Sequence, residues 1–333
     1  MERQVKLNFE PNKHVYSDET GKIYTSVTTV IGKYKEPFNR RYWGMYTALR
    51  DSGFKVRPTN DKKCIVVNGK YRTLDSLYSN PINTHEVGIM LDKWKVLTEA
   101  ACERGNNTHD YLENSINKSK DDDDGSSNTQ IEPQLAKTMQ GAGLVKLRTK
   151  HDLDITNLEE VFPVIYKRLL DYINAGCILY AEKKVYTVQY GIAGMIDVLI
   201  VKGNQFAILD WKTNKDEMLF KSGYYKKVKI NNEWIKSTNW IDRKSYLLPP
   251  LTDIEDCKGM IYSLQLSLYA FIMELWGYTL VPDGLEIFHI RPNLTPKLIK
   301  IRYLKNKVKA LVTHHKKIKT QNKKQTTNLF GIK

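Results

Sequence analysis

Three β-rich runs follow one another near the middle of the 333-residue chain, and they restrict its fold more than any other feature. The runs are Ile178–Val188, Ile192–Lys202 and Gln205–Trp211, with glycine-containing turns between them. Residues 195–201 of the second run are apolar at every position but one, and such a strand is normally covered on both faces. Because helical patterns precede and follow these runs, we expect an α/β fold with a mixed central sheet flanked by helices.

Helical periodicity on both sides of the runs gives the expected order of elements. Helices are predicted at 84–117 with a break near Gly105, and at 133–149, 158–174, 256–276 and 304–319. The pair Asn68–Gly69 predicts a hairpin turn. We expect an N-terminal strand and helix elaboration in residues 1–100 and a core in 101–303. The core carries insertions at 118–130 and 215–250, and residues 304–333 form a basic C-terminal helix and tail.

The net charge of +15 is concentrated at the C-terminal end. Residues 297–333 contain 12 Lys and Arg and no acid, which leaves 40 basic against 37 acidic residues in the rest of the chain. A basic end of this kind favours a polyanionic partner, most often nucleic acid. The alternative is a solvated helix with no partner.

Two classes of protein are disfavoured by what the sequence lacks. It has no run of about 18 apolar residues and no signal-peptide pattern, so we expect a cytoplasmic protein without a membrane partner. Its four cysteines lie far apart and form no Cys-x-x-Cys pair, which argues against a zinc ribbon or a disulfide framework.

One group of polar residues interrupts the buried strands. Asp197 stands in the apolar second run, and Asp210-Trp-Lys212 closes the third. A carboxylate inside a sheet is unfavourable unless it is paired or binds a metal ion, and oxygen ligands favour Mg²⁺ or Mn²⁺. A lysine beside such an ion can orient or deprotonate a water molecule. The alternative is a buried Asp–Lys salt bridge without chemistry.

Four short motifs in order extend this interpretation. They are Gly105-x-x-x-His109, Gly194-x-x-Asp197, Asp210-x-Lys212-Thr213 and Gln265-x-x-x-Tyr269. In this order the chain resembles the PD-(D/E)XK nuclease superfamily, and within it the RecB-like exonuclease branch of phage type. The resemblance covers the chain from about His14 to Tyr303, and it implies a restriction-endonuclease-like form of the α/β fold.

The resemblance also implies a role for each motif residue. Asp197 and Asp210 would bind the metal ion, His109 would add an imidazole ligand, and Lys212 would act on the attacking water. Glu182 is a further acidic candidate; Gln265, Tyr269 and Thr213 are candidates for contact with DNA phosphates. The residues alone leave other interpretations open: a capping or core histidine for His109, a surface glutamate for Glu182, and interior polar residues of a packed helix for Gln265 and Tyr269.

The function implied is a Mg²⁺- or Mn²⁺-dependent DNA exonuclease of phage replication, recombination or repair, acting in the host cytoplasm if phage-encoded. A structure-specific endonuclease or resolvase and a non-catalytic nucleic-acid-binding protein that retains the fold are the alternatives. Iron–sulfur members of this branch carry one upstream cysteine and a cluster of three near the C-terminus. This chain has no cysteine after Cys257, so no iron–sulfur cluster is expected. A Walker A motif is also absent, so a helicase or a single-strand annealing protein would be a separate partner.

The insertion at 215–250 is both aromatic and basic. Its aromatic residues can stack on bases and its lysines can follow phosphates of single-stranded DNA. An equally open interpretation is a β-hairpin flap that covers the core with its own aromatic side chains. The residues concerned are Tyr224, Tyr225, Trp234, Trp240, Lys226, Lys227, Lys229 and Lys236, with a hairpin turn predicted at Asn231–Asn232.

Overall fold

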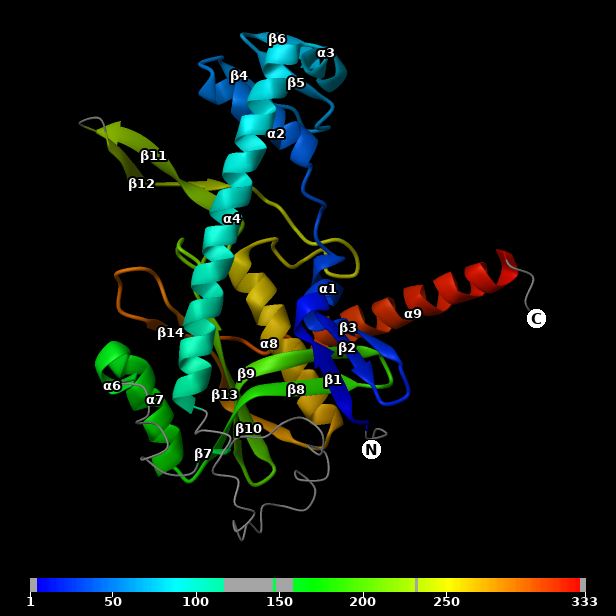
Figure 1. Ribbon diagram of the computed structural model, residues 1–333, viewed down its shortest axis with the longest axis vertical. Coiled ribbons are helices and arrows are strands. Elements are labelled where there is room, and N and C mark those ends of the chain that lie inside the picture. Colours follow the sequence, from blue (N-terminus) through cyan, green and yellow to red (C-terminus); the bar gives the residue numbers. More distant parts are fainter. Residues whose placement is uncertain (1–4, 117–145, 148–157, 231–232, 330–333) are drawn as a thin grey trace. The chain divides into compact units, whose positions relative to one another are not determined.

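The computed structural model describes residues 5–116, 146–147, 158–230 and 233–329 (Figure 1). These fall into two compact units, one made of residues 1–35 and 108–333 and the other of residues 36–107. The predicted insertion at 118–130 and the turn at Asn231–Asn232 lie outside the described residues.

The larger unit is built on a mixed nine-stranded sheet. Its strand order is β1-β2-β3-β9-β10-β13-β14, and β8 and β7 continue from the other edge of β9. β9 and β10 are antiparallel, whereas β3–β9 and β10–β13 are parallel pairs. The strands are β1 Leu7–Glu10, β2 Val15–Asp18, β3 Ile23–Ser26, β7 Lys146–Leu147, β8 Ile178–Thr187, β9 Ile192–Lys202, β10 Gln205–Lys212, β13 Thr279–His289 and β14 Lys297–Lys300.

Helices cover this sheet, and β9 is buried on both faces. Ile196 and Leu199 belong to one hydrophobic cluster, which includes residues of α1, α8 and α9. Val198 and Ile200 belong to a second cluster, which includes residues of α7 and the end of α4. The predicted mixed sheet flanked by helices is therefore confirmed. The helices are α1 Val27–Gly32, α4 Pro81–Ile116, α6 Leu158–Val161, α7 Pro163–Asn174, α8 Lys258–Leu275 and α9 Lys305–Leu329, with a 3-10 turn η1 at Pro11–Lys13.

β3 and β10 share one edge of β9 but do not meet. β10 pairs with β9 as far as Val198, β3 pairs with it at Ile192 and Ala193, and β8 occupies the opposite edge along the whole length. Among the described strands, none therefore lies beside residues 194–197 of β9 on the edge that β3 and β10 share. This gap places Gly194 and Asp197 at an opening in an otherwise continuous sheet.

The smaller unit has its own core and its own three-stranded sheet. The sheet order is β4-β5-β6, and Tyr42, Met45 and Ile65 lie in the buried cluster. Positive φ angles at Asn68 and Gly69 confirm the predicted two-residue turn. Its elements are α2 Arg40–Asp51, β4 Val56–Pro58, β5 Cys64–Val67, β6 Lys70–Thr73, α3 Leu74–Tyr78 and the first part of α4.

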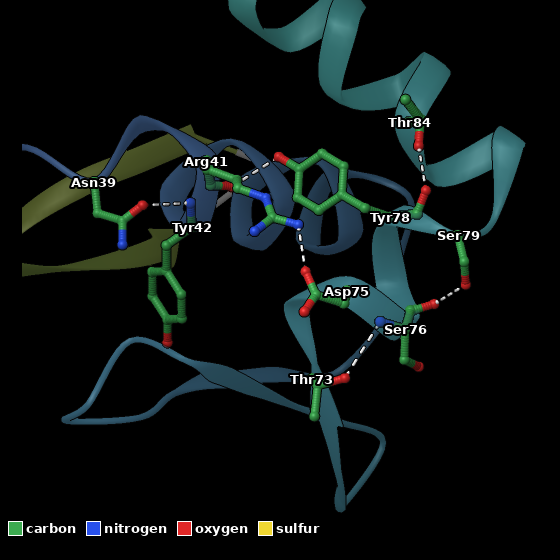
Figure 2. Close-up of polar contacts among 9 residues, drawn as sticks. All are labelled: Asn39, Arg41, Tyr42, Thr73, Asp75, Ser76, Tyr78, Ser79 and Thr84. Atoms are coloured by element: carbon green, nitrogen blue, oxygen red, sulfur yellow. Dashed lines mark hydrogen bonds and ion pairs between the residues drawn. The ribbon is translucent and has the colours of Figure 1, made fainter.

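Side-chain caps and one ion pair fix the helices of this smaller unit (Figure 2). Asn39 caps α2 by accepting from the Tyr42 amide at 2.9 Å, and Thr73 caps α3 in the same way. Arg41 donates to Asp75 at 2.6 Å, and the Tyr78 hydroxyl donates to the Arg41 carbonyl at 2.8 Å. These contacts tie α2 to α3.

Three sequence-based expectations differ from the structure. α4 runs without a break through Gly105, because a single glycine inside a helix costs only about 1 kcal/mol. Lys146–Leu147, expected at the end of a helix over 133–149, form β7 and pair with the edge of β8; the remainder of that predicted helix lies outside the described residues. The expected N-terminal region 1–100 is divided between the two units, because β3 pairs with β9 of the larger one.

Among the described helices, none combines the length and the apolar character needed to cross a membrane.

Candidate functional site

The opening at the middle of β9 brings together polar residues from several elements. Asp197 lies on β9, and Glu182 lies opposite it on β8, between the pairs Ala181–Val198 and Lys183–Ile196. His109 comes from the end of α4 that belongs to the larger unit. His109, Glu182 and Asp197 each offer one ligand atom, and these atoms all lie within 4.8 Å of one another.

Glu182 has an unusual backbone conformation in the middle of a strand. Its φ angle is +47°, in the left-handed region that residues other than glycine rarely adopt. Such strain is costly and concentrates at functional positions, where it aims a side chain. The raised pKa of Glu182 follows first from burial and then from nearby carboxylates, with Asp197 the largest contributor. The structure thus places Glu182 inside an acidic cluster and not on a free strand surface.

Asp197 is held by a backbone contact at the point where β9 and β10 separate. Its Oδ2 accepts from the Trp211 amide at 2.8 Å, directly after the last pair between the two strands. The Nδ1 atom of His109 lies 3.7 Å from the same oxygen, with the His109 side chain about one third exposed. The alternative of a core histidine therefore does not describe His109, and its predicted role as a metal ligand stays a prediction.

Asp210 and Lys212 are two residues apart on β10, so their side chains point to the same face of the sheet. Lys212 Nζ lies 2.5 Å from Asp210 Oδ2, and Asp210 is only 1% exposed. Burial and the carboxylate of Asp197 raise the pKa of Asp210 above its ordinary value, although Lys212 opposes the shift. Burial lowers the pKa of Lys212, but the carboxylates of Asp210 and Asp197 outweigh it and raise that pKa.

The cluster contains more acidic than basic side chains. Neither carboxylate oxygen of Asp210 has a hydrogen-bond donor of suitable geometry among the described residues, so Lys212 provides only a charge contact. Glu182, Asp197 and Asp210 together face one lysine and one imidazole. A buried carboxylate with vacant lone pairs next to two further carboxylates and an imidazole is a donor set that fits a divalent cation.

One face of α8 lies against this cluster. Tyr262, Gln265 and Tyr269 follow the spacing i, i+3, i+7, and Gln265 Nε2 donates to the Tyr269 hydroxyl at 3.2 Å. The Lys212 ammonium lies 4.9 Å from the centre of the Tyr262 ring. Sequence reasoning found Gln265 and Tyr269 but missed Tyr262, which only its place on the same helix face could have signalled.

The close approach of α8 to β9 explains why the Gly194-x-x-Asp197 motif begins with glycine. A Cβ at this position would lie 2.6 Å from Cε1 of Tyr269, closer than real Cβ atoms come to a ring. Only glycine therefore lets α8 place Tyr269 over β9 beside Asp197. The Tyr269 ring is almost fully buried, which raises the pKa of its hydroxyl well above the ordinary value.

Two acidic residues of α4 and the predicted residue Thr213 belong to the surroundings of the cluster. Asp110 and Glu113 of α4 both contribute through their charge to the raised pKa of Glu182. Thr213 directly follows Lys212 at the end of β10 and is half-buried. The predicted contact of Thr213 with phosphate stays a prediction.

Comparisons with protein-family models, with curated proteins and with solved structures gave no match to this chain.

Proposed function

We propose that the protein is a metal-dependent DNA nuclease of the PD-(D/E)XK type, with a restriction-endonuclease-like form of the mixed sheet. The observation that supports this most is the convergence of Glu182, Asp197 and Asp210 from three neighbouring strands, with Lys212 in contact with Asp210. His109 adds a nitrogen ligand at the same point. Four of these five residues belong to the sequence motifs, and Glu182 is the further acidic candidate on the preceding strand.

Four side chains would hold the metal ion in this proposal. Glu182, Asp197 and His109, whose ligand atoms lie close together, would bind Mg²⁺ or Mn²⁺ through carboxylate oxygens and an imidazole nitrogen, and Asp210 would be a further carboxylate ligand. When bound, such an ion polarises a phosphodiester and lowers the pKa of an attacking water molecule. The Trp211 amide fixes the orientation of Asp197, and the strained backbone of Glu182 aims its carboxylate at the same point.

Lys212 is the residue that acts on the reacting groups. Its ammonium can donate a hydrogen bond to the attacking water or to a phosphate oxygen, and so stabilise the charge that develops there. Contact with Asp210 and with the Tyr262 ring holds this ammonium in place. The raised pKa keeps Lys212 protonated, as a donor requires.

The substrate class follows from charge. Residues 297–333 carry 12 basic side chains and no acid, and α9 contains most of them. DNA phosphates are the polyanion that such a helix and a nuclease site would share. We propose an exonuclease, with a helicase or a single-strand annealing protein as a separate partner.

The test compares two substrates and two variants. With Mg²⁺, wild-type protein should release nucleotides from end-labelled linear DNA and leave closed circular DNA intact. Asp210→Asn and Lys212→Gln should each lose about 10³-fold or more in rate while retaining the circular-dichroism spectrum of the wild type. Undiminished activity in both variants would refute the assignment, and cutting of circular DNA would identify an endonuclease or resolvase instead.

The close Asp210–Lys212 contact favours one competing function, a nucleic-acid-binding protein in which the two residues form only a structural ion pair. That protein would bind DNA without turnover at any divalent-ion concentration. A titration with Mg²⁺ and with Mn²⁺ therefore separates the two functions.

A further inference from the structure

The hairpin of β11 (Gly223–Ile230) and β12 (Glu233–Asp242) forms a separate two-stranded sheet. Among the described strands, these two pair only with each other (Figure 1). The base of the hairpin is fixed by hydrogen bonds. Arg243 N donates to the Ser222 carbonyl at 2.9 Å, and Gly259 N, at the start of α8, donates to the Leu219 carbonyl at 3.0 Å. The hairpin is thus anchored to the helix that carries Gln265 and Tyr269.

The hairpin does not serve as a cover for the core. Its described apolar side chains, among them Tyr224, Tyr225 and Trp240, belong to none of the three hydrophobic clusters. Tyr224 and Ile235 are each 45% exposed. A lone two-stranded hairpin has little stability of its own, so large aromatic residues left outside any core need another explanation. The flap interpretation therefore lacks the contacts it requires.

One face of the hairpin combines aromatic and basic side chains. Tyr225 lies opposite Trp240 and Lys227 lies opposite Lys236 in the strand register, so each pair shares a side of the ribbon. The Tyr225 and Trp240 rings meet edge to face at 5.0 Å, and the Lys236 ammonium lies 4.1 Å from the centre of the Tyr225 ring. These contacts place Tyr225, Trp240 and Lys236 on one face, here called the aromatic-basic face. Lys227 joins this face through its pairing with Lys236, beyond a register shift that follows Tyr225.

The charges of the hairpin and of its aromatic-basic face are not balanced within the described part of the chain. Residues 221–244 contain seven Lys and Arg and only two acids. Lys227 and Lys236 are directly opposed, and like charges in that position destabilise a strand pair. Lys236 has a half-exposed partner in Glu217 at 2.8 Å, whereas Lys227 has no acidic partner among the described residues. An anionic ligand would relieve this repulsion.

We propose that the aromatic-basic face binds single-stranded DNA. Unpaired bases present flat faces on which Tyr225 and Trp240 can stack, while Lys227 and Lys236 meet the phosphates. Duplex DNA hides its base faces in the stack, and an acidic protein segment gives the rings nothing to stack on. The choice of DNA rests on the proposed function, whereas the single-stranded form rests on the hairpin itself.

Binding is measured by fluorescence anisotropy of a labelled oligothymidine of about 16 nucleotides, titrated with the full chain in EDTA. Tyr225→Leu should weaken binding about tenfold through loss of one stacking contact, and Tyr225→Phe should bind as the wild type does. The double variant Lys227→Gln/Lys236→Gln should lower the slope of log affinity against log salt by about 1.4. The matched double variant Lys6→Gln/Lys13→Gln, at exposed positions of the N-terminal strand region, should leave that slope unchanged.

Three results would overturn the proposal. The first is a Tyr225→Leu variant that binds oligothymidine as tightly as the wild type does. The second is a wild-type protein that does not bind oligothymidine. The third is a wild-type protein that binds a blunt duplex of the same length as tightly as oligothymidine, with the variants weakening both kinds of binding equally. Because EDTA prevents metal-dependent cleavage, binding is read separately from nuclease activity. A chain that binds as expected but never cleaves DNA refutes the proposed function alone, and a chain that cleaves but binds normally with Leu at position 225 refutes this inference alone.

Discussion

Two buried carboxylates of the larger unit, Glu286 and Asp210, have opposite surroundings. Each is 1% exposed and each lies 2.5 Å from a cationic side chain. Glu286 accepts two hydrogen bonds from the Arg168 guanidinium and a third from the Tyr172 hydroxyl. Asp210 receives only a charge contact from Lys212, and no hydrogen bond of suitable geometry reaches either of its oxygens within the described part of the chain.

The difference shows which ion pair is complete. A guanidinium fork satisfies a carboxylate from the side, and the pair around Glu286 needs nothing more. The hydrogen bonds from Arg168 to Glu286 are the main cause of the raised pKa of the Arg168 guanidinium. Around Asp210, burial and the charge of Asp197 favour the protonated carboxyl. A further cation beside Asp210 would therefore stabilise its ionised form. An ion pair of the first kind stabilises a fold, whereas one of the second kind leaves ligand positions open.

The largest expected effect concerns the Asp210–Lys212 pair, here called the open pair because its carboxylate oxygens accept no hydrogen bond from the described residues. Asp210→Asn keeps the size of the side chain and should reduce Mg²⁺-dependent DNA hydrolysis about 10³-fold or more. Its free energy of unfolding should fall less than that of Glu286→Gln, because burial already disfavours the Asp210 charge and Asp197 remains beside Lys212. Nucleotide release and urea unfolding measure the two quantities. A large loss of stability with little loss of activity would place Asp210 in the same class as Glu286.

The Glu286–Arg168 pair, here called the closed pair, should show the reverse: a change in stability without a change in activity. Glu286→Gln leaves the Arg168 charge without its partner, and we expect a loss of about 3–5 kcal/mol in the free energy of unfolding. The rate per folded molecule should not change. Urea unfolding measures the first quantity, and nucleotide release normalised to the folded fraction measures the second. A strong loss of that normalised rate would mean that the two pairs are coupled.

A smaller effect tests how closely α8 approaches the open pair. Gly194→Ala puts a Cβ 2.6 Å from the Tyr269 ring and 3.1 Å from Val27, which should cost about 1–3 kcal/mol in unfolding free energy. Gly32→Ala is a matched control, since a Cβ there meets no atom within 4 Å. Thermal unfolding of both variants gives the comparison. Equal stability of the two would show that Tyr269 can move away from β9.

The smallest effect concerns a buried group that has neither kind of partner. His315 of α9 is 4% exposed, and its Nε2 has no hydrogen-bond partner among the described residues. Burial first, and then Lys33, Lys319 and His314, lower its pKa from 6.5 to about 4. The folded state therefore resists protonation, so its stability is fully present above pH 6.5 and is lost as the pH falls towards 4.

We expect wild-type stability to drop about 1 kcal/mol more than that of His315→Gln between pH 6.5 and 5.5. Urea unfolding at several pH values measures this difference. Parallel pH profiles would mean that His315 becomes solvated before it is protonated.

The sequence predicted the parts of this architecture that depend on local pattern. The apolar run around Asp197 predicted a strand buried on both faces, and the spacing of Asp210 and Lys212 predicted two polar side chains on one face of the next strand. Four motifs in order named His109, Asp197, Asp210, Lys212, Gln265 and Tyr269, whereas Glu182 belongs to none of them and Tyr262 was missed. Each of these signals lies within a few residues of chain.

The rest depends on contacts that leave no local signal. The left-handed φ of Glu182 and its place opposite Asp197 follow from the register of β8 on β9. Tyr262 belongs to the cluster only because α8 packs with that face towards Lys212. No periodicity in residues 23–26 indicates a strand partner about 170 positions away, and for that reason the predicted boundary at residue 100 differs from the observed division.

The parallel pairing of β3 with β9 has a consequence for biosynthesis. Ile23–Ser26 leave the ribosome long before Ile192 and Ala193 exist, so the first three strands must wait with one edge unpaired. Pairing over such a sequence separation is slow, and exposed edges invite association with other chains during the delay. We therefore expect nascent chains that stop before residue 192 to need chaperone protection, and the finished chain to acquire its N-terminal strands as a late folding event.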